Sequence, residues 1–241
     1  MLNREQRIEQ QAVNYFQADY SNDVIRSLIV KQRLGLWRIS SKSGSIVKRG
    51  MDVVISLLML LMLMPLFIIV ALLIRLESPG SVLFSQTRVG LSGRPFRFWK
   101  FRSMRFDAES TKHQLQHKAM SNGVRFKLKK DPRITPVGAV IRKYSIDELP
   151  QLWNVLLGDM SLVGPRPALP SEVNDYDQAD KQRLSVIPGI TCIWQVSGRS
   201  DIPFKQQVTL DVKYKLSQSI WQDIRLLLLT IPAVVLGKGA Y

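Results

Sequence analysis

The stretch from Val53 to Ile74 constrains the fold of this 241-residue chain more than any other, because it contains no charged residue. About 22 helical residues, each rising about 1.5 Å, are long enough to cross a hydrocarbon core about 30 Å thick. The simplest interpretation is therefore a single membrane-spanning helix.

Two features favour instead a helix that enters the membrane and returns. Pro65 lies in the middle of the stretch, where it removes a backbone hydrogen bond and predicts a kink. Basic residues also flank both ends, whereas a spanning helix usually carries its Lys/Arg excess on one, cytoplasmic side. The flanking cations are Lys42, Lys48, Arg49, Arg75, Arg88, Arg94 and Arg97. We therefore predict a re-entrant helix and keep a spanning helix as the alternative.

The charge balance predicts an anionic partner. The net charge is +15, which suits nucleic acid, an acidic membrane face or phosphorylated substrates. No zinc-finger, basic-zipper or aromatic RNA-binding pattern occurs, so membrane lipids and phosphates are favoured over nucleic acid. The single cysteine, Cys192, excludes an intrachain disulfide. His113 and His117 are spaced for one helix face, but with no third ligand nearby a solvated helix is favoured over a metal site.

A β-hairpin is predicted between Val82 and Met104. Aromatic and β-branched residues lie on either side of the turn sequence Gly90–Gly93. In the second strand, Lys100 and Arg102 share a face by the period of two. These two cations suit either a strand lying on a bilayer surface or a pair directed at phosphates, and the two roles are compatible.

The segment RKYSIDELPQLWNVLLGDMSLVGPRP, from Arg142 to Pro167, places two adjacent acids, Asp147 and Glu148, inside a frame of basic residues. Ser145 and Glu148 have the spacing of a helix capping box, so both acids could simply begin a helix. Pro150 is tolerated only near the start of that helix, which predicts Asp147 as its N-cap. An N-cap carboxylate lies where phosphate also binds, and it could act as a nucleophile toward phosphorus.

Several other segments carry weaker signals. Asp175 and Asp177 form an Asp-x-Asp pair of the kind that metal-dependent glycosyltransferases use, although any acidic helix start can produce it. Gly198 and Arg199 could present a backbone N–H and a guanidinium to an anion. The carboxyl-terminal apolar core of about 11 residues is too short to span and predicts an interfacial or buried helix.

Taken in order, these motifs resemble those of the bacterial sugar transferases, the monotopic polyprenol-phosphate phosphoglycosyl transferases that begin exopolysaccharide, capsule and O-antigen units. The similarity runs from about Ile46 to Tyr241. Its motifs are KRGMD, KFRSM, SIDELPQLWNVLLGDMSLVGPRP, PGITCIWQVSGRSD and WQDIRLLLLTIPAVVLGKGAY. The chain is most similar to the short form of the family, and its WQVSGR segment and tail resemble the galactose-1-phosphate transferases. Cys192 departs from the pattern, because the family usually has Gly at this position.

The resemblance implies an α+β monotopic membrane protein with a re-entrant helix, interfacial amphipathic helices and a small β-hairpin. Its parts would be an N-terminal arm (1–45), a re-entrant helix kinked at Pro65 (46–76) and a catalytic domain (77–241). The catalytic domain would lie on the cytoplasmic face of the bacterial inner membrane. Whether the arm mediates formation of a homo-oligomer is left open.

The resemblance also implies the chemistry. Asp147 would be a covalent nucleophile, Glu148 its partner, and Mg²⁺ would bind near both carboxylates. The expected substrates are a UDP-sugar, with galactose ahead of glucose, and undecaprenyl phosphate. Residues expected around the phosphates or the nucleotide are Lys100, Arg102, Arg142, Arg166, Gln195 and Arg199, with Pro165 and Pro167 shaping the turn.

Two alternatives remain at this point. One is single-displacement transfer by a metal-dependent glycosyltransferase that uses Asp175 and Asp177. The other is a basic scaffold on the membrane surface with no enzymatic activity.

Overall fold

The computed structural model describes residues 45–108 and 131–236. The expectations for the N-terminal arm, His113 and His117 fall outside the described residues. The chain divides into two compact units, Met1–Gly50 and Met51–Tyr241. The acid pair and the residues that contact it belong to the second unit.

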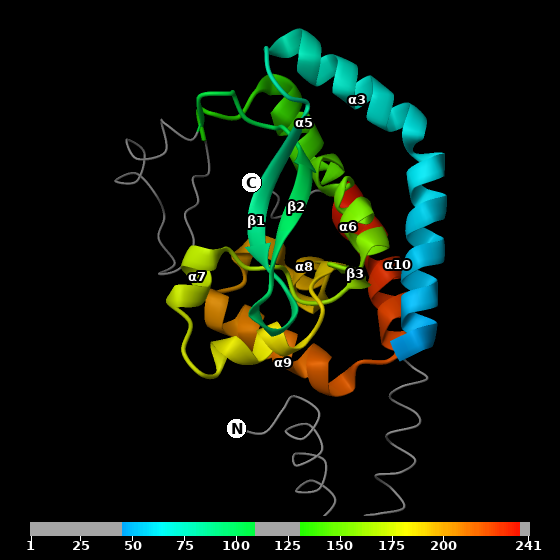
Figure 1. Cartoon of the computed structure of the whole chain (residues 1–241), viewed down its shortest axis with the longest axis vertical. Coiled ribbons are helices and arrows are strands. Elements are labelled where there is room, and N and C mark those ends of the chain that lie inside the picture. Colours follow the sequence, from blue (N-terminus) through cyan, green and yellow to red (C-terminus); the bar gives the residue numbers. More distant parts are fainter. Residues whose placement is uncertain (1–44, 109–130, 237–241) are drawn as a thin grey trace, which may run out of the picture. The chain divides into compact units, whose positions relative to one another are not determined.

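Two helices meet at the predicted kink. The helix Ser45–Met62 is followed by α3 (Met64–Glu77), and the two are bent by 59° (Figure 1). Pro65 lies in the first turn of α3, where a missing N–H is tolerated. No single helix among the described residues is long and apolar enough to cross a membrane, and one bent pair, this one, reaches that length and hydropathy. The kink is confirmed, and its relation to a membrane stays a prediction.

The predicted hairpin is confirmed. Strands β1 (Leu83–Val89) and β2 (Pro95–Phe101) are antiparallel, and Phe84 is paired with Lys100 (Figure 1). A short 3-10 turn, η1 (Leu91–Gly93), joins them, with Ser92 in the left-handed region at φ 56°.

A second, parallel sheet was not predicted as such. Strand β3 (Ser161–Val163) pairs with β4 (Gly189–Thr191), and Ser161 N donates to Pro188 O at 2.8 Å. After Thr191 the chain leaves β4 and forms α8 (Ile193–Ser197). Since the strands are parallel, the segments that follow them leave from the same edge of the sheet.

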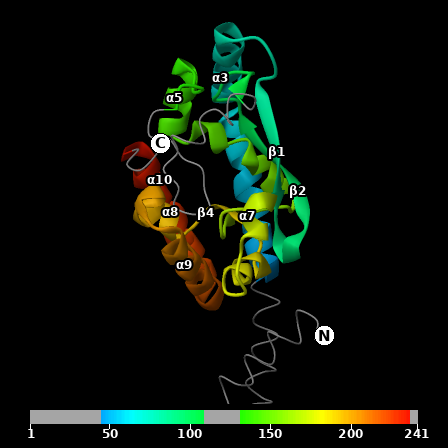
Figure 2. The same ribbon diagram turned by 90° about the vertical axis from the view of Figure 1, so that its left-hand side faces the viewer.

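Helices pack against the two small sheets, with the β1–β2 hairpin at the outer edge, so the described residues form an α+β fold (Figure 2). The longest carboxyl-terminal helix, α10 (Ile220–Leu236), confirms the helix predicted in the apolar tail. The remaining helices are α5 (Pro136–Lys143), α6 (Gln151–Leu157), α7 (Pro170–Asn174), α9 (Phe204–Ser217) and α10 (Ile220–Leu236), with 3-10 helices η3 (Ile146–Glu148), η4 (Asp180–Ser185) and η5 (Arg199–Asp201).

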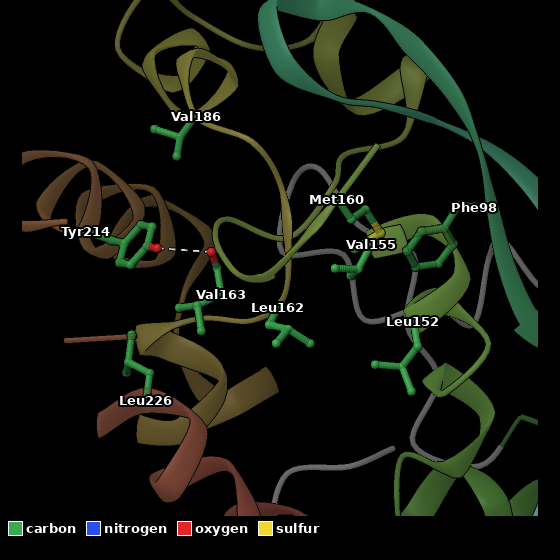
Figure 3. Packing of buried hydrophobic residues seen from close by; sticks show 9 residues of the cluster. All are labelled: Phe98, Leu152, Val155, Met160, Leu162, Val163, Val186, Tyr214 and Leu226. Atoms are coloured by element: carbon green, nitrogen blue, oxygen red, sulfur yellow. Dashed lines mark hydrogen bonds between the residues drawn. The ribbon is translucent and has the colours of Figure 1, made fainter. Parts of the chain in front are cut away.

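The main core joins the hairpin, α6, β3 and the two carboxyl-terminal helices (Figure 3). Leu152 and Val155 of α6 pack with Leu162 of β3, and the Tyr214 hydroxyl donates to Val163 O at 3.0 Å. The cluster consists of Phe98, Leu152, Val155, Met160, Leu162, Val163, Val186, Tyr214 and Leu226. It holds β3 between α6 and the carboxyl-terminal helices.

A second cluster attaches α3 to the hairpin and to α5. Val70 and Ile74 pack against Phe101 of β2 and Ile141 of α5, and Phe67 meets Phe101 edge-on at 5.3 Å. The hairpin therefore contacts both the bent helix pair and the helix that leads to the acid pair.

Candidate active site

The acid pair lies in one 3-10 turn, η3, between α5 and α6. Ser145 precedes it in the left-handed conformation, with φ 54° and ψ 21°, and its side chain caps no N–H. Ser145 N donates to Arg142 O at 3.0 Å, and Glu148 N donates to Ser145 O at 3.1 Å. A serine held in this region is under backbone strain, a feature that clusters at functional sites.

The predicted capping box is wrong, and so is the prediction that Asp147 is an N-cap. The α6 helix has Pro150 as its N-cap, and its first residue is Gln151. A capping box needs an extended residue before the helix, but Ser145 follows directly on the last turn of α5 and is left-handed. The charge on Asp147 therefore depends on neighbouring side chains and not on an N-cap position.

Glu148 is held by two cations. Its Oε1 accepts from Lys100 Nζ at 2.5 Å and from Arg166 Nη1 at 3.2 Å. Burial alone would raise the pKa of Glu148, but the charges of Lys100 and Arg166 outweigh it and hold the pKa well below its usual range. Glu148 is consequently an anion with a fixed position.

Asp147 is more deeply buried than Glu148, at 7% exposed, but no cation among the described residues holds it in this way. Its closest cation is Lys100, with Nζ 3.9 Å from Oδ2, and no described residue donates a hydrogen bond to its carboxylate. Burial raises the pKa of Asp147, Lys100 lowers it in part, and the charge of Glu148 raises it again. Its oxygens therefore have lone pairs available to a ligand.

Strand β2 places Lys100, and one buried amide links β2 to α6. Asn154 is fully buried; its Oδ1 accepts from Trp99 N at 3.2 Å, and its Nδ2 donates to Arg97 O at 2.6 Å. The pair of bonds fixes the strand against the helix that follows the acids. Asn154 was not predicted from the sequence, although an Asn on the buried side of an apolar helix is a usable signal.

Arg166 comes from the Gly164–Pro167 turn at the end of β3. Gly164 N donates to Thr191 O and Gly189 N to Pro165 O, both at 2.9 Å. A Cβ on Gly164 would clash with Ile187 O, so the two backbones could not approach this closely with a side chain there. At the last residue of this turn, Arg88 Nη1 donates to Pro167 O at 3.2 Å.

Two further predicted residues, Arg142 and Arg199, interact electrostatically with the dyad of Asp147 and Glu148. The positive charges of Arg142, at the end of α5, and of Arg166 lower the pKa of Asp147, although burial outweighs them. Arg199, left-handed at φ 52°, has its pKa lowered by burial, while the charge of Glu148 partly restores it. Gln195 is in α8, and its Oε1 accepts from Cys192 Sγ at 3.0 Å.

Cys192, where the resemblance led us to expect glycine, has an unstrained backbone conformation. Its φ of −154° and ψ of 174° are extended values that any residue adopts. Burial raises the pKa of its thiol well above the usual value, so the thiol stays protonated and can donate to Gln195.

The structure does not bring Arg102 to the acid pair. It lies just past the end of β2, and its guanidinium donates to Ser78 O at 2.7 Å and Pro79 O at 2.5 Å. These carbonyls follow α3, so Arg102 stabilises the exit from the bent helix pair. The face shared with Lys100 was inferred from strand periodicity, which no longer holds where β2 has ended.

The surroundings of Asp175 and Asp177 differ from those that a metal-dependent glycosyltransferase would require of its Asp-x-Asp pair. Asp177 contacts Lys205 Nζ at 2.7 Å, and the same Nζ lies 3.0 Å from Asp180. Asp177 and Asp180 also accept each other's backbone N–H. Asp175 ends α7. An ammonium group therefore lies between the carboxylates of Asp177 and Asp180.

Asp147 and Glu148 are the residues at this site that could hold a metal ion. Among the described residues, no group of three or more His, Cys, Asp and Glu side chains is placed to hold one. Two carboxylates suit Mg²⁺, which typically takes one or two carboxylates and completes its shell with phosphate oxygens and water. The donor set thus fits Mg²⁺ in a complex with a phosphorylated substrate.

Comparison with known proteins identifies relatives along almost the whole chain. A galactosyl transferase, CpsE of Streptococcus agalactiae, is 56% identical over 67% of this chain and 36% of its own. The exopolysaccharide production protein ExoY of Sinorhizobium fredii is 41% identical over 82% of this chain and 89% of its own. The undecaprenyl-phosphate galactose phosphotransferase of Salmonella typhimurium is 39% identical over 92% of this chain and 48% of its own.

This chain therefore spans only part of the first and third of these relatives and most of the second. The model of the bacterial sugar transferase family matches residues 43–237, which include both helices of the bent pair, the acid pair and the carboxyl-terminal helices. On this match, the chain belongs to the bacterial sugar transferase family.

Proposed function

We propose that the protein transfers a hexose 1-phosphate from a UDP-hexose to undecaprenyl phosphate through a phosphorylated Asp147. The observation that carries the proposal is the contrast within the dyad. Glu148 is bound by Lys100 and Arg166, whereas the adjacent Asp147 carboxylate is buried, raised in pKa and accepts no hydrogen bond from the described residues. An anion with unoccupied lone pairs inside a cationic frame is suited to attack phosphorus.

In the first half of the reaction, an Asp147 oxygen attacks the β-phosphorus of the UDP-hexose. A bond forms between that oxygen and phosphorus, and the bond from the β-phosphorus to the bridging oxygen breaks. UMP leaves with the bridging oxygen, and the hexose phosphate remains on Asp147 as an acyl phosphate. No proton needs to be removed when Asp147 is ionised, and the charges of Lys100, Arg142 and Arg166 favour the ionised form against the effect of burial on its pKa.

In the second half, an oxygen of undecaprenyl phosphate attacks the same phosphorus. The bond to Asp147 breaks, the carboxylate is restored, and the product is a diphosphate-linked lipid sugar. Both steps bring anions together, so fixed positive charge lowers the barrier. Lys100, Arg142, Arg166 and Arg199 supply that charge, and Glu148 keeps Lys100 and Arg166 in place.

Mg²⁺ is the proposed cofactor, with Asp147 and Glu148 as the residues that would hold it. When bound, it would neutralise charge on the diphosphate and on the departing UMP.

The acceptor explains why the site would lie at the inner membrane, on its cytoplasmic face. A polyprenol leaves a bilayer at a cost of about 0.8 kcal/mol for each CH₂ group, so the enzyme has to reach the headgroups. The bent helix pair supports a re-entrant anchor, and Met62, beside the bend, is 81% exposed. Exposed apolar side chains also occur on α5 and α6, the helices that flank the acid pair in the sequence, and include Val140, Trp153 and Leu157.

Galactose is the proposed sugar ahead of glucose. Two of the relatives described above carry galactose or galactosyl in their names, and each is at least 39% identical to this chain. A UMP-release assay across a panel of UDP-sugars with undecaprenyl phosphate would identify the donor.

Trapping tests the covalent step. UDP-galactose labelled at the β-phosphate, incubated without acceptor, should place label on Asp147, and Asp147→Asn should lose both the label and UMP release. Turnover by a wild-type protein that never acquires label would favour single displacement. Undiminished membrane binding together with no UMP release from any UDP-sugar would favour the scaffold.

A further inference from the structure

Strand β3 leads into the turn that carries Arg166. The backbone of β3 forms hydrogen bonds on more than one side of the strand. On the β4 side, Ser161 N donates to Pro188 O at 2.8 Å and Gly164 N to Thr191 O at 2.9 Å. Away from β4, a strand of a two-stranded sheet has no neighbouring strand to satisfy its polar groups. Buried N–H groups on that edge still need partners.

One partner comes from the helix Ser45–Met62. Leu162 N donates to Asp52 Oδ1 at 3.1 Å, between residues 110 apart in the chain, and both residues are 3% exposed. The Tyr214 hydroxyl of α9 binds the next residue, at Val163 O. A carboxylate from the apolar helix therefore takes the place that a third strand would otherwise fill.

Few residues connect the hydrogen bond at Leu162 to the dyad of Asp147 and Glu148. Four residues after Leu162, Arg166 extends to Glu148, with Nη1 3.2 Å from Oε1. The turn between them is rigid, because Pro165 and Pro167 flank Arg166 and Gly189 N holds Pro165 O. A sideways shift of β3 would consequently move Arg166 relative to Glu148.

We propose that Asp52 is a positioning residue for phosphosugar transfer, holding β3 so that Arg166 stays against Glu148. The proposal rests on the proposed function, since it concerns the rate of that reaction. It also gives the bent helix pair a second role, because its first helix sets the geometry of the active-site turn in addition to anchoring the protein.

Two substitutions separate the hydrogen bond from the charge. Asp52→Leu removes the acceptor for Leu162 N, and kcat for UMP release should fall roughly tenfold, with a smaller change in KM for the UDP-sugar. Asp52→Asn keeps an oxygen acceptor and should retain most of the wild-type kcat. Asp52→Ala removes the acceptor without added volume and replaces Asp52→Leu if that variant does not fold.

Ser56 supplies a matched control. It lies one turn further along the same helix and is fully buried, and its Oγ has no hydrogen-bond partner among the described residues. Ser56→Ala therefore makes a similar polar-to-apolar change without removing a hydrogen bond to β3, and it should leave kcat near wild type. An equal loss of kcat in Ser56→Ala and Asp52→Leu would overturn the proposal.

A double-mutant cycle tests the route through Arg166. If Asp52 acts through Arg166, Asp52→Leu should cost less than about twofold in an Arg166→Ala background, because the group it positions is already gone. Independent, multiplicative losses would contradict this route.

Hydrogen exchange separates this proposal from the proposed function. Asp52→Leu should speed exchange at the Leu162 amide without any substrate present, whereas Ser56→Ala should not. If the wild-type protein releases no UMP, the proposed function fails, and unchanged exchange in Asp52→Leu would independently reject the role of Asp52.

Discussion

At the scale of single residues, two adjacent carboxylates have opposite electrostatics. Cations lower the pKa of Glu148, although burial opposes them, and burial raises the pKa of Asp147. A raised pKa means that the folded state holds the proton more tightly than the unfolded chain does. Ionisation of Asp147 therefore lowers the free energy of unfolding of the protein, whereas ionisation of Glu148 raises it.

Asp147→Asn should accordingly be more stable than wild type at pH 8, despite being inactive. The gain should disappear toward pH 3, below the ordinary Asp pKa of about 3.9, where Asp147 is protonated in both states. Thermal unfolding at both pH values measures this, and each kcal/mol corresponds to about 2–4 °C in Tm for a chain of this size.

Glu148→Gln is the matched control with the opposite sign. It removes the ion pairs with Lys100 and Arg166, so it should lower Tm at pH 8 and approach wild type only when acid protonates Glu148. A lower Tm for Asp147→Asn at pH 8 would contradict this assignment of the two carboxylates.

Ser145 carries the backbone strain of the site. At φ 54° a β-branched side chain is disfavoured by about 1–2 kcal/mol, whereas glycine adopts this region freely. Ser145→Val should therefore destabilise the protein and lower UMP release by moving the dyad. Ser145→Gly should keep the stability of wild type, as chemical denaturation would report, and a fully stable Ser145→Val would show that the turn relaxes without cost.

At the scale of elements, prediction from the sequence succeeded where local patterns decide the outcome. The turn at Gly90–Gly93 and the alternation in β2 predicted the hairpin, and Pro65 predicted the bend. Prediction failed where contacts between segments that are distant in the sequence determine the structure. The parallel β3–β4 pair consists of two three-residue strands, too short for a periodic signal, and their pairing follows from a close approach of Gly164 and Gly189.

The same distinction applies to the site. Lys100, Arg166 and Glu148 were predicted together and do meet, but Arg102 was assigned by periodicity beyond the end of its strand. The capping-box pattern was misleading because α5 ends immediately before it. Asn154 and Asp52 were not assigned to the site, since both act on backbone groups that only tertiary structure brings within reach.

Asn154 gives a prediction at this scale. Asn154→Ala leaves Trp99 N–H and Arg97 O of β2 without their buried partner, which should cost about 2–5 kcal/mol of unfolding free energy. It should also reduce activity by loosening Lys100 from Glu148. Trp153→Ala is the control, because Trp153 is adjacent but 53% exposed and should cost far less. Equal losses in the two variants would remove the special role of the amide.

At the scale of the whole molecule, the bent helix pair is the basis of the proposed re-entrant anchor, which would place both ends of the chain on the same side of a membrane. A continuous helix from Ser45 to Glu77 would be long enough to span, whereas a pair bent by 59° is compatible with a re-entrant loop. Proline in a helix interior costs about 3 kcal/mol relative to alanine, so removing it favours the straight form by a similar amount.

Pro65→Ala should therefore convert part of the population to a spanning topology. An Asn3→Cys probe near the N-terminus reports this, because Cys192, the only native cysteine, is buried. In intact cells, a membrane-impermeant thiol reagent should label the probe in Pro65→Ala and leave it unlabelled in the otherwise unchanged protein. Pro79→Ala, beyond the end of α3, is the control and should stay unlabelled. Labelling without the Pro65 change would mean that the chain already spans, and the re-entrant anchor would have to be abandoned.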